Sequence, residues 1–160
     1  MKRLMTAVVA IALVSGSAVL AFGQSAEPWL GTWRINLAKS TYSPGPKPTT
    51  AGTIKQEAAQ GGFKTTIDGL NALGKPTHTE RSWKFDGKDY PVQGAAASNT
   101  TESYRRIDGH TFEITQKING KVTTTNRVVT SADGKTGSAT ITGTNAQGQT
   151  VNNVIFMEKQ

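Results

Sequence analysis

The chain has 160 residues, no cysteine and a formal net charge of +7 at pH 7. Without cysteine it can form no disulfide and carry no lipid-modified N-terminal cysteine. Its basic residues are scattered rather than gathered with aromatic residues along one stripe, so we expect no nucleic-acid interface.

Residues 1–23 have the pattern of a secretory signal peptide. Lys2 and Arg3 precede an apolar run over residues 4–20, and Ala21-Phe22-Gly23 places small residues at positions −3 and −1 of a cleavage site. We therefore expect an exported bacterial protein, periplasmic or extracellular, with one domain over residues 24–160.

A retained membrane anchor is the alternative interpretation of this leader. Ser15-Gly16-Ser17 interrupts the apolar run, whereas a spanning helix needs about 20 predominantly apolar residues. We expect no stable membrane insertion after cleavage.

The sequence after residue 50 has the turn signals of β-hairpins. Asp-Gly or Asn-Gly pairs, which suit the positive φ angles of type I′ turns, occur four times between residues 86 and 134. They are Asp86-Gly87, Asp108-Gly109, Asn119-Gly120 and Asp133-Gly134.

The segments between these turns alternate with period two, as half-buried strands do. In TFEITQKI, for example, Phe112, Ile114 and Ile118 share one face. No segment has a helical period of useful length. We expect strands over residues 29–35, 51–58, 61–68, 77–85, 88–92, 100–108, 110–118, 121–131, 136–144 and 149–158.

Many short antiparallel strands joined by tight turns predict a barrel or a sandwich. Short links between successive hairpins favour an up-and-down meander, and closing it leaves no exposed edge. The sequence therefore predicts an all-β, up-and-down antiparallel barrel of about eight to ten strands.

The two ends of this predicted barrel resemble those of a known group of proteins. GTWRIN, at residues 31–36, resembles the G-x-W first strand of the calycins, the lipocalins and fatty-acid-binding proteins. IFMEKQ, at residues 155–160, resembles the closing strand of fatty-acid-binding proteins. The opening is also similar to that of small secreted bacterial proteins with a lipocalin-like barrel.

This resemblance implies structural roles for four residues. Gly31 would let the first strand bend, and Trp33 would plug one end of a calycin-like barrel. Lys159 or Arg127 would pack across the indole as its cationic partner.

Two departures separate the chain from fatty-acid-binding proteins. Those proteins place two helices after the first strand, but SPGPKPTT, at residues 43–50, cannot be helical because each proline removes a donor and fixes φ. Their arginine–tyrosine pair for the ligand carboxylate aligns with Ile155 and Met157. We therefore do not expect a fatty acid to be held in the family's way.

The sequence nominates no catalytic or metal-binding residue and no cofactor. Its two histidines, His78 and His110, have no partners at metal-ligand spacing, and no G-x-S-x-G nucleophile motif occurs. An enzyme is accordingly the least favoured of the function classes considered.

The candidate ligand-binding residues are Arg81, Trp83, Arg105 and Arg127. Arg81 shares a strand face with Trp83, and an arginine that points inward needs a carboxylate beside it, from the protein or from a ligand. The alternative is that these arginines are solvated or pair with glutamates on neighbouring strands.

We thus expect a secreted, lipocalin-like barrel that binds a small, largely apolar molecule, with an anionic group as an option. The alternative is an envelope-associated interaction or structural protein with a solid barrel interior. The sequence does not define the oligomeric state.

Overall fold

A computed structural model describes residues 27–71, 73–95, 98–145 and 147–160. The expected leader, residues 1–23, lies outside these described residues. No helix in the described part of the chain is long and apolar enough to cross a membrane.

The described chain forms one antiparallel sheet of ten strands in the order β4-β3-β2-β1-β10-β9-β8-β7-β6-β5. The chain therefore runs up and down between neighbouring strands, and its last strand returns to the first, with Trp33 opposite Lys159. The prediction of an all-β, up-and-down antiparallel barrel is confirmed. The strands are β1 Gly31–Ile35, β2 Thr53–Ala59, β3 Gly62–Leu70, β4 Pro76–Trp83, β5 Tyr90–Pro91, β6 Thr100–Arg106, β7 Thr111–Ile118, β8 Lys121–Thr130, β9 Thr136–Thr144 and β10 Thr150–Lys159.

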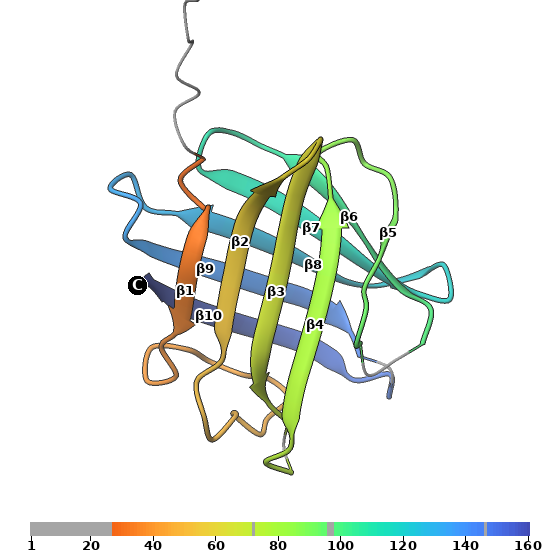
Figure 1. The fold of residues 1–160 in the computed structure, drawn as a ribbon. Helices are drawn as coiled ribbons and strands as arrows, with labels where there is room; N and C mark the ends of the chain where they lie inside the picture. Colours follow the sequence, from red (N-terminus) through yellow and green to blue (C-terminus); the bar gives the residue numbers. More distant parts are fainter. Residues whose placement is uncertain (1–26, 72, 96–97, 146) are drawn as a thin grey trace, which may run out of the picture.

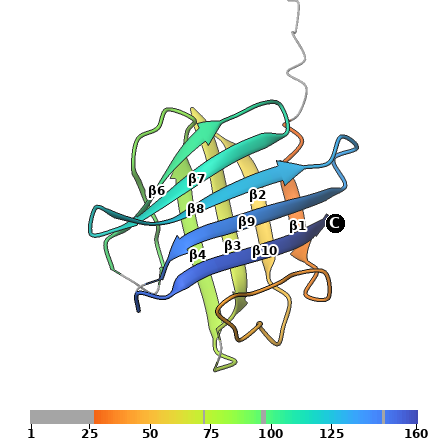
Figure 2. The same cartoon turned by 180° about the vertical axis from the view of Figure 1, so that it is seen from behind.

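The sheet curls so that its two halves face each other. Figure 1 shows β1 to β4 as the front layer, with β7 to β10 crossing behind them at a steep angle, and Figure 2 shows the back layer from outside. Side chains alternate along each strand, so every second residue points between the layers. This architecture is compatible with a calycin-like barrel.

The segment after β1 continues the sheet instead of forming a helical lid. Thr41 bridges to Val154 on β10, and Asn152 N donates to Ser43 O at 2.7 Å. These residues lie beside the first half of β10, because β1 pairs only with Met157 to Lys159 at the end of that strand and itself ends at Ile35. The proline-rich continuation then leads to β2.

The barrel is incompletely closed between β4 and β5. Glu80 and Gln93 exchange two backbone hydrogen bonds, of 3.0 and 2.9 Å, and this bridge is isolated. The next hydrogen-bonded pair in that register would be Ser82 with Pro91. Proline has no N–H to donate to the Ser82 carbonyl, so the ladder stops and the strands diverge. We call this opening the seam.

One end of the barrel is filled by an aromatic cluster consisting of Trp29, Trp33, Phe63, Trp83, Phe85 and Phe112. Trp29 lies in the turn before β1, is 1% exposed, and packs edge-on against Phe85 and Phe112 with centroid separations of 5.6 and 5.4 Å. The Arg106 guanidinium lies 4.7 Å from the Trp29 ring and forms an ion pair with Glu27 across the top. This end is therefore sealed by side chains.

Candidate functional site

The barrel interior away from the aromatic cluster is hollow. A distal cavity of about 470 Å³ lies toward the other end of the barrel, and its wall includes Ile67, Ile141, Val151, Gln116 and Asn153. An inner cavity of about 60 Å³ lies between it and the aromatic cluster. The two share four wall residues, Ile67, Arg81, Ile114 and Asn126, so they are neighbouring parts of one interior space. A volume of this size is within the range of small-molecule sites.

Arg81, Glu102 and Tyr104 form a buried polar triad in the wall of this interior space. Arg81 Nε lies 2.9 Å from Glu102 Oε2 and donates a 3.1 Å hydrogen bond to Tyr104 Oη. The Tyr104 hydroxyl in turn donates to Glu102 Oε2 at 2.5 Å. The Arg81 and Glu102 side chains are only 9% and 8% exposed, so the charges neutralise each other away from bulk water.

The triad holds Tyr104 in its protonated form. Burial raises the pKa of the Tyr104 phenol well above its ordinary value, and the Glu102 carboxylate raises it further. Arg81 lowers the same pKa, but the other two effects prevail. Tyr104 therefore acts as a fixed hydrogen-bond donor to Glu102 at neutral pH.

Strand alternation and the seam together assemble the triad. Arg81 points inward from β4, and Glu102 and Tyr104, two residues apart, point inward from β6. β4 and β5 are the two edges of the sheet, so the two-residue strand β5 lies between β4 and β6 where the barrel closes, and the long Arg81 side chain reaches past it. The contact thus depends on the closure of the barrel and not on a local sequence pattern.

Two amide side chains line the inner cavity without satisfying their hydrogen-bonding capacity. Gln56 is 8% exposed, and its side chain forms no hydrogen bond with any described residue. Asn126 Oδ1 is fully buried and likewise has no partner in the described part of the chain. Buried polar atoms are normally paired, so both amides have hydrogen-bonding capacity that the described chain does not use.

Trp83 forms a wall behind the triad. Its indole stacks on Tyr104 with a centroid separation of 4.0 Å and an interplanar angle of 10°, and Nε1 donates to Thr65 Oγ1 at 2.8 Å. At 2% exposure it belongs to the aromatic cluster as much as to the site.

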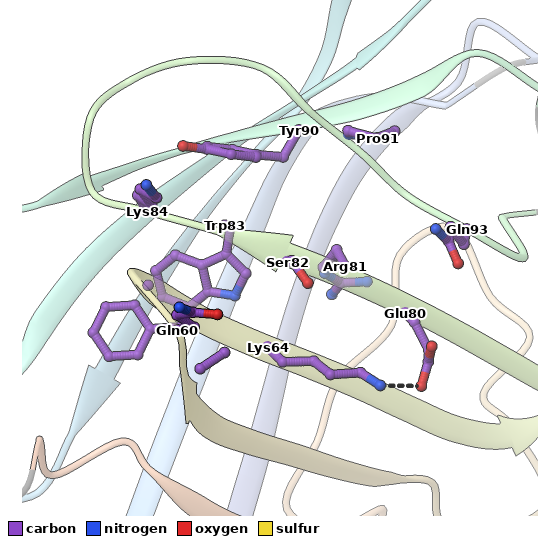
Figure 3. Close-up of a pocket in the computed structure, with 13 residues that line it drawn as sticks. Gln60, Lys64, Glu80, Arg81, Ser82, Trp83, Lys84, Tyr90, Pro91 and Gln93 are labelled. Atoms are coloured by element: carbon purple, nitrogen blue, oxygen red, sulfur yellow. Dashed lines mark ion pairs between the residues drawn. The ribbon is translucent and has the colours of Figure 1, made fainter.

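A further hollow of about 470 Å³ opens at the seam, and Figure 3 shows the residues around it. Tyr90 lies across the opening from Trp83, and the Lys64–Glu80 ion pair of 2.7 Å marks its rim. Arg81 is the one residue that lines this hollow, the distal cavity and the inner cavity. Its guanidinium therefore stands where all three meet.

The other two candidate arginines lie on the outside of the barrel. Arg105 is exposed and pairs with Glu113 on β7 at 2.9 Å, as the alternative interpretation proposed for it. Arg127 is exposed on β8, where it faces away from the interior that Asn126 and Val128 line. The structure does not bring either of them to Arg81.

The residues with predicted structural roles meet at the sealed end. Trp33 is 2% exposed, and Lys159 Nζ lies 4.9 Å from its ring centroid while donating to Pro28 O at 3.0 Å. Gly31 has a φ of 126°, and a Cβ there would come within 3.2 Å of the Lys159 side chain. Of the two cationic partners considered for the indole, Lys159 has this position.

The candidate ligand-binding residues predicted from the sequence do not include Glu102, Tyr104, Gln56 or Asn126. The run Thr100-Thr101-Glu102-Ser103-Tyr104 did carry a signal, because period two places Glu102 on the face of Tyr104. Gln56 shares a strand face with Ile54, and Asn126 shares one with Val128, so period two gave a weak signal that these amides face inward.

Among the described residues, no group of three or more His, Asp and Glu side chains is arranged to hold a metal ion. His78 is on the outer face, where Nδ1 lies 2.6 Å from Asp68 and Nε2 lies 3.6 Å from Glu80. The interior therefore presents hydrogen-bonding groups around the Arg81–Glu102 ion pair, whose charges cancel, and apolar walls beside them.

Comparison of the chain with models of known protein families gives no match, and comparison with curated protein sequences gives none either.

Proposed function

We propose that the protein is an exported, calycin-like barrel that binds a small molecule in the distal cavity. The observation that carries this proposal is a hollow of about 470 Å³ whose wall includes Asn126, with a buried Oδ1 that has no partner among the described residues. A solid interior would have no room for a ligand.

The walls support a ligand with two different parts. Ile67, Ile114, Ile141 and Val151 offer apolar surface, whereas Arg81 and the unpaired amides are concentrated toward the inner cavity. An apolar body with a polar end that points inward fits this distribution. Export through the N-terminal leader would place such a carrier in the periplasm or outside the cell.

The alternative is an interaction or structural protein of the cell envelope whose interior has no ligand. The outward arginines and the exposed Val122 and Leu73, 54% and 82% exposed, are features that such a protein could use. They are single residues, and isolated exposed apolar side chains are normal on protein surfaces.

Native mass spectrometry of the protein purified from its own host tests the proposal. We expect a stoichiometric small molecule that is released on denaturation. Ile141→Trp, which puts an indole into the distal cavity, should lose this mass, and Thr140→Trp, at the exposed neighbouring position on β9, should keep it. An apo mass for the wild-type chain, or equal cargo in both variants, would refute binding in this cavity.

A further inference from the structure

The charges around the interior space cancel. Arg81 and Glu102 are the only charged residues among the described side chains that line the distal and inner cavities, and they form an ion pair with each other. A ligand carboxylate placed here would have to share Arg81 with Glu102. It would also lose its hydration on entering a site that has no net positive charge. Such desolvation is costly when no spare cation compensates it.

The hydrogen-bonding groups that remain free are both donors and acceptors. Asn126 Oδ1 is a buried acceptor without a partner in the described chain, and the Gln56 amide is unpaired beside it in the inner cavity. The Arg81 hydrogen bond comes from Nε, and neither Nη group bonds a described residue. An occupant that only accepts would pair with Arg81 but leave Asn126 Oδ1 unsatisfied.

We infer that the polar end of the ligand is an uncharged group that donates and accepts hydrogen bonds, such as a primary amide, and not a carboxylate. This inference rests on the proposed function and adds the chemical class of the ligand. An amide N–H₂ can donate to Asn126 Oδ1 or to the Gln56 carbonyl, and its oxygen can accept from an Arg81 Nη group. The apolar remainder of the ligand then lies along Ile141 and Val151 in the distal cavity.

Three eight-carbon probes that differ only in the head group test this inference by isothermal titration calorimetry. Octanamide is neutral and both donates and accepts, methyl octanoate is neutral and only accepts, and octanoate is charged at neutral pH. We expect octanamide to bind wild-type protein about tenfold more tightly than either of the others, because each of those leaves a buried group unpaired or a charge uncompensated. Equal or tighter binding of octanoate or methyl octanoate would overturn the inference, as would failure of octanamide to bind.

Two variants connect the preference to the residues that cause it. Asn126→Leu should remove most of the advantage of octanamide over methyl octanoate, whereas Thr125→Leu, at the preceding and outward position on β8, should preserve it. Glu102→Gln leaves Arg81 without its counter-charge, so octanoate should bind this variant several-fold more tightly than wild type. Unchanged selectivity in folded Asn126→Leu protein, checked by circular dichroism, would overturn the assignment.

The experiments distinguish a wrong head-group class from a failure of the proposed ligand binding itself. If the wild-type chain binds octanoate best, the cavity still holds a small molecule and only the ligand class is wrong. If the protein from its own host carries no cargo and no probe binds, the cavity is not a site at all. The probe comparison on the wild-type chain decides the class even where a variant does not fold.

Discussion

Arg81→Met should lower the free energy of unfolding by about 3–5 kcal/mol, because it leaves the Glu102 carboxylate buried without a cation. The structure favours the lower part of this range. Glu102 is 8% exposed at its side chain but keeps the 2.5 Å hydrogen bond from Tyr104, which still stabilises the negative charge. Methionine fills much of the space of the arginine stem, so little of the loss should come from packing.

Urea denaturation followed by tryptophan fluorescence measures this loss, with linear extrapolation to water. The double variant Arg81→Met with Glu102→Met is the matched control, since it removes both charges. It should be more stable than Arg81→Met alone, although Tyr104 then loses its acceptor. A loss below about 1 kcal/mol for Arg81→Met, the size expected of a solvated surface pair, would refute the buried-pair reasoning.

Three further predictions concern other parts of the barrel. Trp33→Ala should cost about 3–5 kcal/mol by the same assay, because the indole is 2% exposed in the sealed end; an unchanged midpoint would contradict this. Pro91→Val supplies a backbone N–H that can donate to the Ser82 carbonyl and extend the β4–β5 pairing. Hydrogen exchange at this new amide should therefore be slow. Fast exchange there would contradict the explanation that Pro91 causes the seam. The Tyr104 pKa is raised in the folded state, so the protonated phenol contributes its full stability below the ordinary pKa of 10.0 and loses it as the pH rises above that value. Ultraviolet titration should show one tyrosine that ionises only when the protein unfolds. Ionisation of all three tyrosines in the native state would contradict this.

Turn signals and period-two alternation were enough to predict the barrel, and alternation placed Arg81 and Trp83 on one strand face. It could not decide which face of the expected strands 100–108 and 121–131 points inward, because apolar residues occur on both faces of each. Ile107 and Val129 lie on the same strand faces as Arg105 and Arg127, yet these two apolar residues are 36% and 38% exposed. Near strand ends an apolar side chain can remain outside at little cost.

The remaining features depend on closure of the sheet. The Arg81–Glu102 contact joins β4 to β6, which no short-range pattern connects. The expected first strand, residues 29–35, includes Trp29, but this residue lies in the turn before β1 and packs over the barrel end, where Arg106 contacts its ring. Pro91 was a usable signal, because a proline within a predicted strand indicates an unpaired edge, and that edge is the seam.

Occupancy of the interior can be observed directly in a crystal structure of the protein as purified from its own host. We predict continuous non-protein electron density in the distal cavity, with its polar end within hydrogen-bonding distance of Asn126 and Arg81. Side chains collapsed into this space, or density confined to the hollow at the seam, would contradict the account.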